Sequence, residues 1–358
     1  MSLVSSRGII RASKNPDCEL LAAMALEEGN EKRFFKQLTG EEYPGEYGER
    51  NSARRRGAQF EANAHANDAA RLKAALSPFI HVSPEDMVVR NFVDEFPGPI
   101  NRIHAVRLHR VRRILRDLRA GRPVPHLLIQ PTLALNVIDA EFGAFYISPD
   151  FLGFDPAIGM YRVGELKSFI QRDRASLDPE DLDNTRRQSA IGILALMDEA
   201  ARHSLTVPED SLALFVFSTP FGLKPADPHQ ERLLAEIEQI RRGVSSMRAA
   251  AARLAGMRGE TDTVLANLAD DLGTHYRESC VGSCLLAKRC ESKDATSPAR
   301  LGDNAVRVFG REDLDSVARL LAADPAELLE FQLEIRQKAQ DAAAVLGMPY
   351  DDFVRMIA

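Results

Sequence analysis

Two short segments that otherwise read as β-strands carry charged residues where strand-forming residues would be expected. The first is YISPDFLGFD at residues 146–155, and the second is YRVGELKSF at residues 161–169. Side chains two positions apart on a strand point to the same face, so Glu165 and Lys167 project together while Leu166 faces the core. The tight turn DPAIGM between the segments allows them to pair with each other.

Pairing of these two segments brings Asp150 close to Glu165. Two carboxylates and the intervening backbone carbonyl of Leu166 form an oxygen-rich site of the kind that Mg²⁺ and Mn²⁺ prefer, and such ions hydrolyse phosphodiesters. Lys167, beside the metal ion, can orient or polarise the attacking water and offset charge that develops on the phosphate. Asp155 is a competing carboxylate, but it precedes a proline at the start of a turn, where Asp is commonly structural.

Four cysteines form a second group with chemical potential. Cys280, Cys284 and Cys290 lie together in SCVGSCLLAKRCES, and Cys18 stands alone near the other end. In a reducing cytoplasm, clustered thiols indicate metal ligands or redox groups. A zinc ribbon normally brings two pairs of Cys, whereas three thiolates on a tight loop with a remote fourth are typical of an iron-sulphur cluster. The alternative is an ordinary buried thiol at Cys18, with the other three binding zinc or nothing.

Composition places the chain among globular proteins. Its 358 residues suit one large elaborated domain or two ordinary ones, and 45% hydrophobic with 27% charged residues is neither disordered nor membrane-like. The N-terminal stretch lacks the apolar region of a secretory signal, and no apolar run is long enough to span a bilayer, so we expect a cytoplasmic protein with no membrane partner. A net charge of -6 means that nucleic-acid binding must come from local basic patches.

Helical and strand-like patterns surround the charged segments. Apolar spacing predicts helices at residues 18–38, 53–76, 103–118 and 181–204, and from Pro228 to about Leu272. Strands are predicted in HLLIQPTLALNVI, in the two charged segments and in LALFVFSTP. This order predicts an α/β core with a central mixed sheet. The cysteine loop and a tail of two or three short helices follow, one of them opened by Asp324 and Pro325.

The charged segments and the cysteines together resemble the PD-(D/E)XK nuclease superfamily. The motif is PD at residues 149–150 followed by ELK at 165–167, and one early Cys with a late C-x3-C-x5-C resembles the RecB-like iron-sulphur branch. That branch includes CRISPR-associated exonucleases that trim spacers and the nuclease domain of AddB-type helicase-nucleases. The first step of the cysteine spacing is one residue wider than the commonest version of the family.

Two further stretches resemble motifs of the same branch. RRRGAQFE is similar to the first motif, a helix in which Gly is followed four residues later by Glu or His, and it places Gly57 and Glu61. His65, one turn further along, is an alternative ligand. RRQSAIG is similar to the Q-x3-Y motif, in which Gln188 fits and Gly192 stands in the place of the Tyr. Gln188 is alternatively an ordinary polar residue of its helix.

The resemblance implies a restriction-endonuclease-like core, in which helices flank a central mixed β-sheet, together with an iron-sulphur region and a helical C-terminal tail. It divides the chain into an N-terminal helical segment at 1–50 that carries Cys18, a nuclease core at 51–298 with the cysteine loop 280–290, and the tail at 299–358. The implied residues are catalytic Asp150, Glu165, Lys167 and Gln188, metal ligands Glu61, Asp150, Glu165 and Leu166 for Mg²⁺ or Mn²⁺, and 4Fe-4S ligands Cys18, Cys280, Cys284 and Cys290.

Arginines accumulate on one side of the helix predicted at 103–118 and just beyond it. Seven arginines against the single Asp117 are a lopsided balance for solubility alone in an acidic protein, so we expect contact with phosphates, the alternative being a solvated face. Three more arginines precede Glu61 and can lead a DNA strand to the metal ions. The DNA-binding candidates are Arg54, Arg55, Arg56, Arg107, Arg110, Arg112, Arg113, Arg116 and Arg119.

Three functions from different classes are compatible with these residues. The leading hypothesis is a metal-dependent deoxyribonuclease, exonuclease or endonuclease, with a structural cluster, acting in phage defence, CRISPR-like processing or recombinational repair. The chain carries no helicase motor, so a helicase or defence-system partner would be a separate protein. The alternatives are a catalytically idle nucleic-acid-binding module and an iron-sulphur redox sensor.

Overall fold

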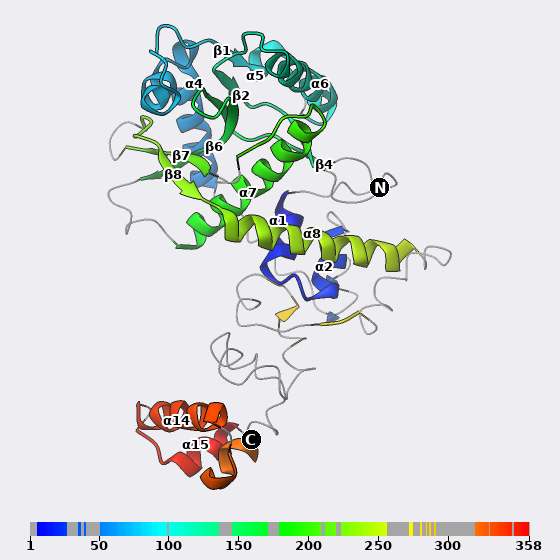
Figure 1. Cartoon of the computed structure of the whole chain (residues 1–358), viewed down its shortest axis with the longest axis vertical. Coiled ribbons are helices and arrows are strands. Elements are labelled where there is room, and N and C mark those ends of the chain that lie inside the picture. Colours follow the sequence, from blue (N-terminus) through cyan, green and yellow to red (C-terminus); the bar gives the residue numbers. More distant parts are fainter. Residues whose placement is uncertain are drawn as a thin grey trace. The chain divides into compact units, whose positions relative to one another are not determined.

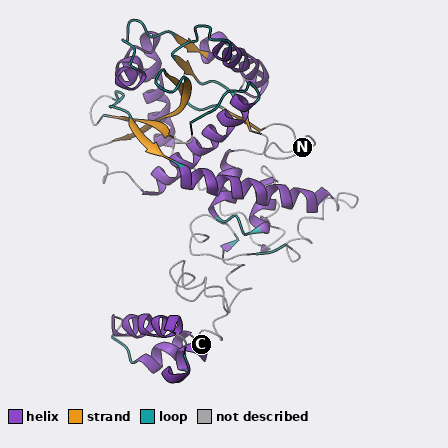
Figure 2. Ribbon diagram, in the orientation of Figure 1, coloured by secondary structure: helices purple, strands orange, loops and turns teal. Residues whose placement is uncertain are grey.

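In the computed structural model the chain folds as helices around a mixed β-sheet (Figure 1; Figure 2). The structure describes residues 6–26, 35–36, 39–40, 51–98, 100–135, 145–170, 179–208, 212–219, 223–255, 272–274, 280, 284, 286–287, 290, 319–328, 330–345 and 347–357. The chain divides into two compact units: one comprises Met1–Pro16, Ala22–Gly29 and Pro44–Gly256, and the other Asp17–Leu21, Asn30–Tyr43 and Met257–Ala358. This division groups the cysteine loop with the C-terminal tail.

Six strands form the main sheet in the order β1-β2-β5-β6-β7-β8. Their bounds are β1 (Val89–Asn91), β2 (Leu127–Ile129), β5 (Phe151–Asp155), β6 (Met160–Ile170), β7 (Leu212–Ser218) and β8 (His229–Arg232). The pairs β1-β2 and β6-β7 are parallel, and the other pairs are antiparallel. The predicted central mixed sheet is therefore confirmed. Strands β3 (Leu133–Leu135) and β4 (Phe145–Ile147) form a separate antiparallel pair.

The helices that precede residue 256 account for most of the predicted helical segments. They are α1 (Ser6–Lys14), α2 (Glu19–Leu26), α4 (Asn51–Ile80), α5 (Phe92–Glu95), α6 (Ile100–Arg119), α7 (Pro179–Ala201) and α8 (Leu234–Ala255). The helix expected from Pro228 begins only at Leu234, because the preceding residues form β8, and its expected continuation from 256 to 271 lies outside the described residues. No helix in the described part of the chain is long and apolar enough to cross a bilayer.

Helix α4 covers one face of the sheet. Its buried Phe60, Leu72 and Leu76 belong to one hydrophobic cluster with Phe151 and Leu166 on the strands. Full burial of each such side chain stabilises the fold by roughly 1.5–3 kcal/mol, so this contact holds α4 firmly against β5 and β6. The strand face that carries Leu166 is therefore the core face, as the alternation of residues in β6 predicts.

The single long helix predicted at 53–76 is interrupted. Residues Ala66, Asn67, Asp68 and Ala69 have non-helical torsion angles, and the last three have positive φ. Asp68 accepts an ion-paired hydrogen bond from Lys73 at 2.5 Å across the break. Asn and Asp adopt positive φ more readily than most residues, which allows the chain to turn there. The break comes directly after His65 and sets the end of the helical segment that carries Glu61.

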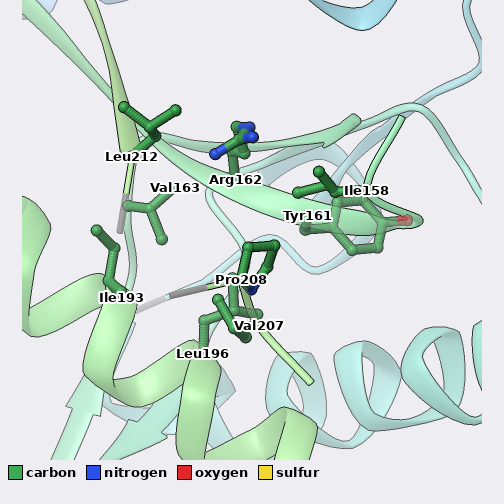
Figure 3. Close-up of a pocket in the computed structure, with 9 residues that line it drawn as sticks. All are labelled: Ile158, Tyr161, Arg162, Val163, Ile193, Leu196, Val207, Pro208 and Leu212. Atoms are coloured by element: carbon green, nitrogen blue, oxygen red, sulfur yellow. The ribbon is translucent and has the colours of Figure 1, made fainter. Parts of the chain in front are cut away.

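Helix α7 packs on the opposite face of the sheet. A Cβ atom on Gly192 would lie 3.0 Å from Val163 Cγ1, and residues 163 and 166 point to opposite faces of β6. The apolar gap between α7 and β6 is lined by Val163, Ile193 and Leu196, among others (Figure 3). Its volume of about 10 Å³ admits no more than a water molecule. The close approach leaves little room for a side chain at residue 192.

The pairing of β5 with β6 sets the position of the acidic residues. Phe151 lies opposite Gly164, and Phe154 lies opposite Tyr161, as the turn between the two segments predicts. A Cβ atom on Gly164 would lie only 2.0 Å from Phe151 Cζ, so the phenyl ring occupies the space above the glycine. Since Asp150 precedes Phe151 and Glu165 follows Gly164, this contact fixes the register of the two carboxylates.

A small helical group ends the second unit. It contains the 3₁₀ turn η3 (Pro325–Glu327) and helices α14 (Glu330–Val345) and α15 (Tyr350–Ile357). Asp324 caps η3 by accepting a hydrogen bond from the Ala326 N–H at 2.9 Å, as the sequence predicts. The 3₁₀ helix ends after a single turn, and α14 begins as a separate helix. Leu321 and Phe353 pack in its core, and Tyr350 donates to the Leu321 carbonyl.

Replacement of Gly164 by alanine tests the contact that sets the strand register. The added methyl group would collide with the Phe151 ring, and overpacking of this kind costs about 1–3 kcal/mol. We expect urea denaturation to show that loss for Gly164→Ala. Gly57→Ala is the matched control, because a Cβ atom there meets nothing within 4 Å and alanine favours a helix. Equal stability of Gly164→Ala and the unaltered protein would contradict the contact.

Candidate metal-ion and catalytic site

Four predicted catalytic residues meet where β5 begins and β6 passes beside it. Asp150 Oδ2 accepts a hydrogen bond from the backbone N–H of Leu166 at 2.7 Å. Lys167 Nζ donates to Glu165 Oε2 and to Gln188 Oε1 of α7, each at 3.0 Å. Strand β6 therefore supplies both partners of the ion pair, Glu165 and Lys167. Asp150, directly before β5, and Gln188 of α7 complete the group.

Glu165 is the most constrained member of this group. Its side chain is 0% exposed, and Oε1 has no hydrogen-bond partner among the described residues. Burial raises the pKa of Glu165; Lys167 opposes the shift, and the neighbouring Asp150 carboxylate adds to it. A buried carboxylate oxygen without a donor is costly, and a second carboxylate beside it increases the cost. A cation bound between them would relieve both effects.

Lys167 carries the compensating positive charge. Burial by itself would lower the pKa of Lys167, but the negative charges of Glu165 and Asp150 raise it above its ordinary value. The ammonium group therefore stays protonated. Gln188 accepts one of its hydrogen bonds and so restricts the direction in which the amine can point. This contact gives Gln188 a partner in the site, beyond that of an ordinary polar helix residue.

Helix α4 brings both of its candidate ligands toward the same carboxylates. Glu61 is close enough to Lys167 to contribute to the raised pKa of the lysine. Burial lowers the pKa of His65, and the charges of Asp150 and then Asp94 act in the opposite direction. His65 Nε2 is buried without a hydrogen-bond partner among the described residues. An unpaired imidazole nitrogen is a suitable metal ligand, so His65 stands beside Glu61 as a candidate.

Asp94 of α5 was not singled out by sequence reasoning. Its carboxylate accepts a hydrogen bond from the Asn91 amide at 2.7 Å, and it lies near enough to His65 to influence the pKa of the imidazole. Helix α5 has only four residues, Phe92–Glu95, too short to show a helical apolar period. The available signal was the acidic pair that follows the strand-like VVRNF, where a strand end turns polar.

The competing carboxylate Asp155 has a different environment. It pairs with Arg162 at 2.8 Å, and its Oδ1 accepts from the Ala157 N–H at 3.0 Å. Both contacts belong to the turn that joins β5 to β6, at the other end of these strands from Asp150. Asp155 therefore stabilises the turn and stays outside the group formed by Asp150, Glu165 and Lys167.

The donor set fits a hard divalent cation that retains water ligands. Within the described residues, no three His, Cys, Asp or Glu side chains are arranged closely enough to enclose a metal ion unaided. Asp150 and Glu165 nevertheless present two adjacent carboxylates, one of them with an unpaired buried oxygen, and the Leu166 carbonyl follows Glu165 on β6. Mg²⁺ commonly binds through one or two carboxylates and keeps several waters.

All four cysteines belong to the second unit. None forms a disulfide, and Cys18, Cys280 and Cys290 are buried. Burial raises the pKa of Cys284 to about 12; a backbone hydrogen bond opposes this effect, and the charges of the other three cysteines add to it. Hydrogen bonds of the Leu20 N–H to the Gly273 carbonyl and of the Gly273 N–H to Glu19 join the segment around Cys18 to the C-terminal part.

Two of the candidate DNA-binding arginines are committed to internal contacts. Arg107 is 3% exposed, and its guanidinium donates to the carbonyls of Gln130 and Phe96 at 3.4 and 3.2 Å. Arg112 makes two hydrogen bonds, at 2.7 and 2.8 Å, to Glu199, whose side chain is fully buried. Both arginines hold α6 in place, so the structure assigns them a packing role in place of the expected phosphate contact.

The remaining arginine candidates differ in exposure. Arg55, Arg113, Arg116 and Arg119 are exposed, Arg56 and Arg110 are half-buried, and the side chain of Arg54 lies outside the described residues. The Nε atoms of Arg56 and Arg110 are buried without a hydrogen-bond partner in the part of the chain that is described. The exposed arginines of α6 can therefore contact a polyanion such as DNA. Arg107 and Arg112 are held by their internal contacts.

Comparison of the chain with protein-family models, with curated proteins and with solved structures finds no match. The fold seen is α/β, with a mixed six-stranded sheet flanked by helices. The chemistry of the site is accordingly argued from its own residues: two apposed carboxylates, one lysine bound to one of them and one glutamine that orients the lysine.

Thermal unfolding with and without Mn²⁺ tests the paired carboxylates as a metal site. A ligand that binds only the folded state at 100 times its Kd stabilises by about 2.7 kcal/mol, so Mn²⁺ should raise the Tm of the unaltered protein. Glu165→Gln removes one of the two carboxylates, so the variant should gain little from Mn²⁺ when its Tm is compared with its own Tm in the absence of metal. Asp155→Asn, in the turn, should keep the Mn²⁺ response; an equal response in Glu165→Gln would disprove the site.

The cysteine group has its own test in metal content and stability. We expect protein purified without oxygen to contain iron and sulphide, and Cys284→Ala to lose both and to melt at a lower temperature, because buried thiolates and a cross-link between distant segments are lost together. Glu165→Gln should retain the iron and serves as the control. Stoichiometric zinc without iron, or an unchanged Tm in an iron-free Cys284→Ala protein, would overturn the expectation.

Proposed function

We propose that this protein is a metal-dependent DNA nuclease with a restriction-endonuclease-like core and a structural iron-sulphur cluster. The observation that carries the proposal is the buried Glu165 carboxylate, with one oxygen unpaired, beside Asp150 and bound to Lys167. Proteins rarely leave such a group without a partner, and a functional cation is a physical reason to keep it. The order of motifs along the chain supports the same reading.

The carboxylates and the Leu166 carbonyl are the residues that would hold Mg²⁺ or Mn²⁺. Bound there, the ion would activate a water molecule and offset negative charge on a scissile phosphodiester. Asp150 is already fixed by the hydrogen bond from the Leu166 N–H, so one of its oxygens is oriented by the backbone. Glu61 or His65 of α4 would complete the protein ligands from the other side of the group.

Lys167 and Gln188 form the part of the site that acts on the substrate. A protonated lysine adjacent to the carboxylates can donate a hydrogen bond to a phosphate oxygen or to the attacking water. The negative charges of Glu165 and Asp150 keep the lysine protonated while it does so. Gln188 keeps the amine in place from α7. Gln188 is thus a positioning residue, and its loss should reduce cleavage less than the loss of Lys167.

The burial of the cysteines favours a structural cluster over a redox sensor. Cys18, Cys280 and Cys290 each have less than a tenth of their surface exposed, which limits access of an oxidant or an electron partner. The catalytically idle binding module is disfavoured by a different observation. An idle site has no reason to keep a buried carboxylate, an adjacent carboxylate and a lysine in hydrogen-bonding contact.

Cleavage assays on linear and circular DNA, single- and double-stranded, test the activity directly. We expect cleavage with Mn²⁺ or Mg²⁺ and none with EDTA. Lys167→Met should lower the rate by about 10²–10³, because it removes the donor aimed at developing charge. Glu165→Gln should lower it at least as far, because the metal ion would lose a ligand.

The control and the competing outcome are equally specific. Asp155→Asn changes a carboxylate of the same strand pair that lies outside the group, so its cleavage rate should stay near that of the unaltered protein. Binding of DNA without any metal-dependent cleavage would establish the idle module instead. Unchanged cleavage by Glu165→Gln would remove the assignment of the catalytic group.

A further inference from the structure

Arginines surround an open hollow at the C-terminal end of α6. It is lined by Arg113, Arg116, Asp117, Arg122 and Pro123 and has a volume of about 490 Å³. Arg122 lies just after the helix, where the chain turns toward β2. A hollow of this size is within the range of ligand-binding pockets, but its walls are mainly charged groups, whereas most small-molecule pockets are mainly apolar.

The positive charge of the hollow is only partly compensated. Asp117 is its acidic residue, and it is ion-paired with Arg122. Arg113 and Arg116 are exposed, and their side chains take part in no hydrogen bond or ion pair within the described residues. Two guanidinium groups with exposed donors therefore face solvent, and such groups match the oxygens of phosphates.

Arg202, directly after the end of α7, adds further positive charge. Glu199 accepts from Arg112 and also lies 3.6 Å from Arg202, so one buried carboxylate serves two arginines. Arg116 is part of the same neighbourhood, as the pKa of His203 shows. Burial lowers this pKa, the negative charge of Glu199 raises it, and the positive charges of Arg116, Arg112 and Arg202 lower it further. The excess of positive charge thus extends across the junction of α6 and α7.

Helix α6 links the hollow to the strand end that carries Asp150. Arg107 donates to the Gln130 carbonyl, and the Gln130 N–H donates to the Asp150 carbonyl at 2.9 Å. At 1.5 Å per residue, Arg116 is roughly 13–14 Å further along the helix axis than Arg107. Phosphates of one DNA strand follow one another about every 3.4 Å along the axis, so a strand parallel to α6 would pass roughly four phosphates between these two arginines.

We propose that the arginine hollow binds the sugar-phosphate backbone of the substrate DNA, away from the bond that is cleaved. The inference rests on the proposed nuclease function and adds a second contact that bond cleavage itself does not use. Arginine contacts to phosphates position a duplex and carry no direct sequence information. The hollow therefore increases affinity for long DNA of any sequence.

The salt dependence of DNA binding tests the hollow. In a Glu165→Gln background, which binds without cutting, affinity for a duplex of about 30 base pairs is measured between about 50 and 200 mM salt. Arg113→Gln/Arg116→Gln should weaken binding and reduce the slope of log affinity against log salt by about 1.8, since each lost phosphate contact removes about 0.9. Arg112 is left intact, because its loss would strand the buried Glu199 charge and destabilise the fold.

Matched controls separate the hollow from general charge and from the metal site. Arg241→Gln/Arg242→Gln removes two exposed arginines of α8 and should leave the slope unchanged. An equal slope in the 113/116 variant and the parent would overturn the proposal. So would binding of ATP that depends on Arg113 and Arg116 without any effect on the duplex, since the hollow would then be a site for free nucleotides.

Cleavage of a small phosphodiester distinguishes failure of the hollow from failure of the proposed function. Mn²⁺-dependent hydrolysis of bis(p-nitrophenyl) phosphate by the unaltered protein requires only the metal site. If this ester is hydrolysed and the salt slope of the 113/116 variant is unchanged, the nuclease assignment stands and the hollow is excluded. If neither the ester is hydrolysed nor DNA bound, both proposals fail.

Discussion

A single backbone hydrogen bond, from the Leu166 N–H to the Asp150 carboxylate, determines where two acidic side chains lie side by side on the central strands of the sheet. The Phe151 ring above Gly164 holds the strands in the register that makes this bond possible. Glu165 is then obliged to point away from the α4 core and toward α7, where Lys167 is its ion-pair partner. The remaining features of the site adjust to this arrangement: α7 supplies a glutamine, and α4 supplies an acid and an imidazole.

The parts of the site that follow from local periodicity were predictable from the sequence. Alternation along β6 placed Glu165 and Lys167 on one face, and the short turn after Asp155 implied the pairing that brings Asp150 alongside. The one-plus-three cysteine pattern likewise implied that Cys18 lies near the loop, and the charges of all four thiols do interact. In each case the spacing in the chain and the geometry of a strand or turn are enough to define neighbours.

Long-range packing accounts for what the sequence did not indicate. Arg112 reads as one more cation on a basic helix, because its partner Glu199 is distant in sequence and is buried only by the meeting of α6 and α7. The break in α4 at Ala66–Ala69 interrupts a good apolar spacing, and Asn67 and Asp68, which adopt positive φ more readily than most residues, were its one local signal. Gly192 lies where α7 approaches Val163 closely, with an added Cβ only 3.0 Å from Val163 Cγ1, a distance that no single segment specifies.

Strand β8 has a consequence for the solution behaviour of the chain. Its neighbour β7 reads LALFVFS and is almost entirely buried, a composition that favours pairing with other copies when such a strand lies at an open edge. The strand that covers it is four residues of sequence HQER, polar and charged, which make a poor template for another chain. A truncation or a loop exchange that removed residues 229–232 would therefore expose the aggregation-prone edge of β7. Insoluble protein would follow even though every residue of the catalytic group remained.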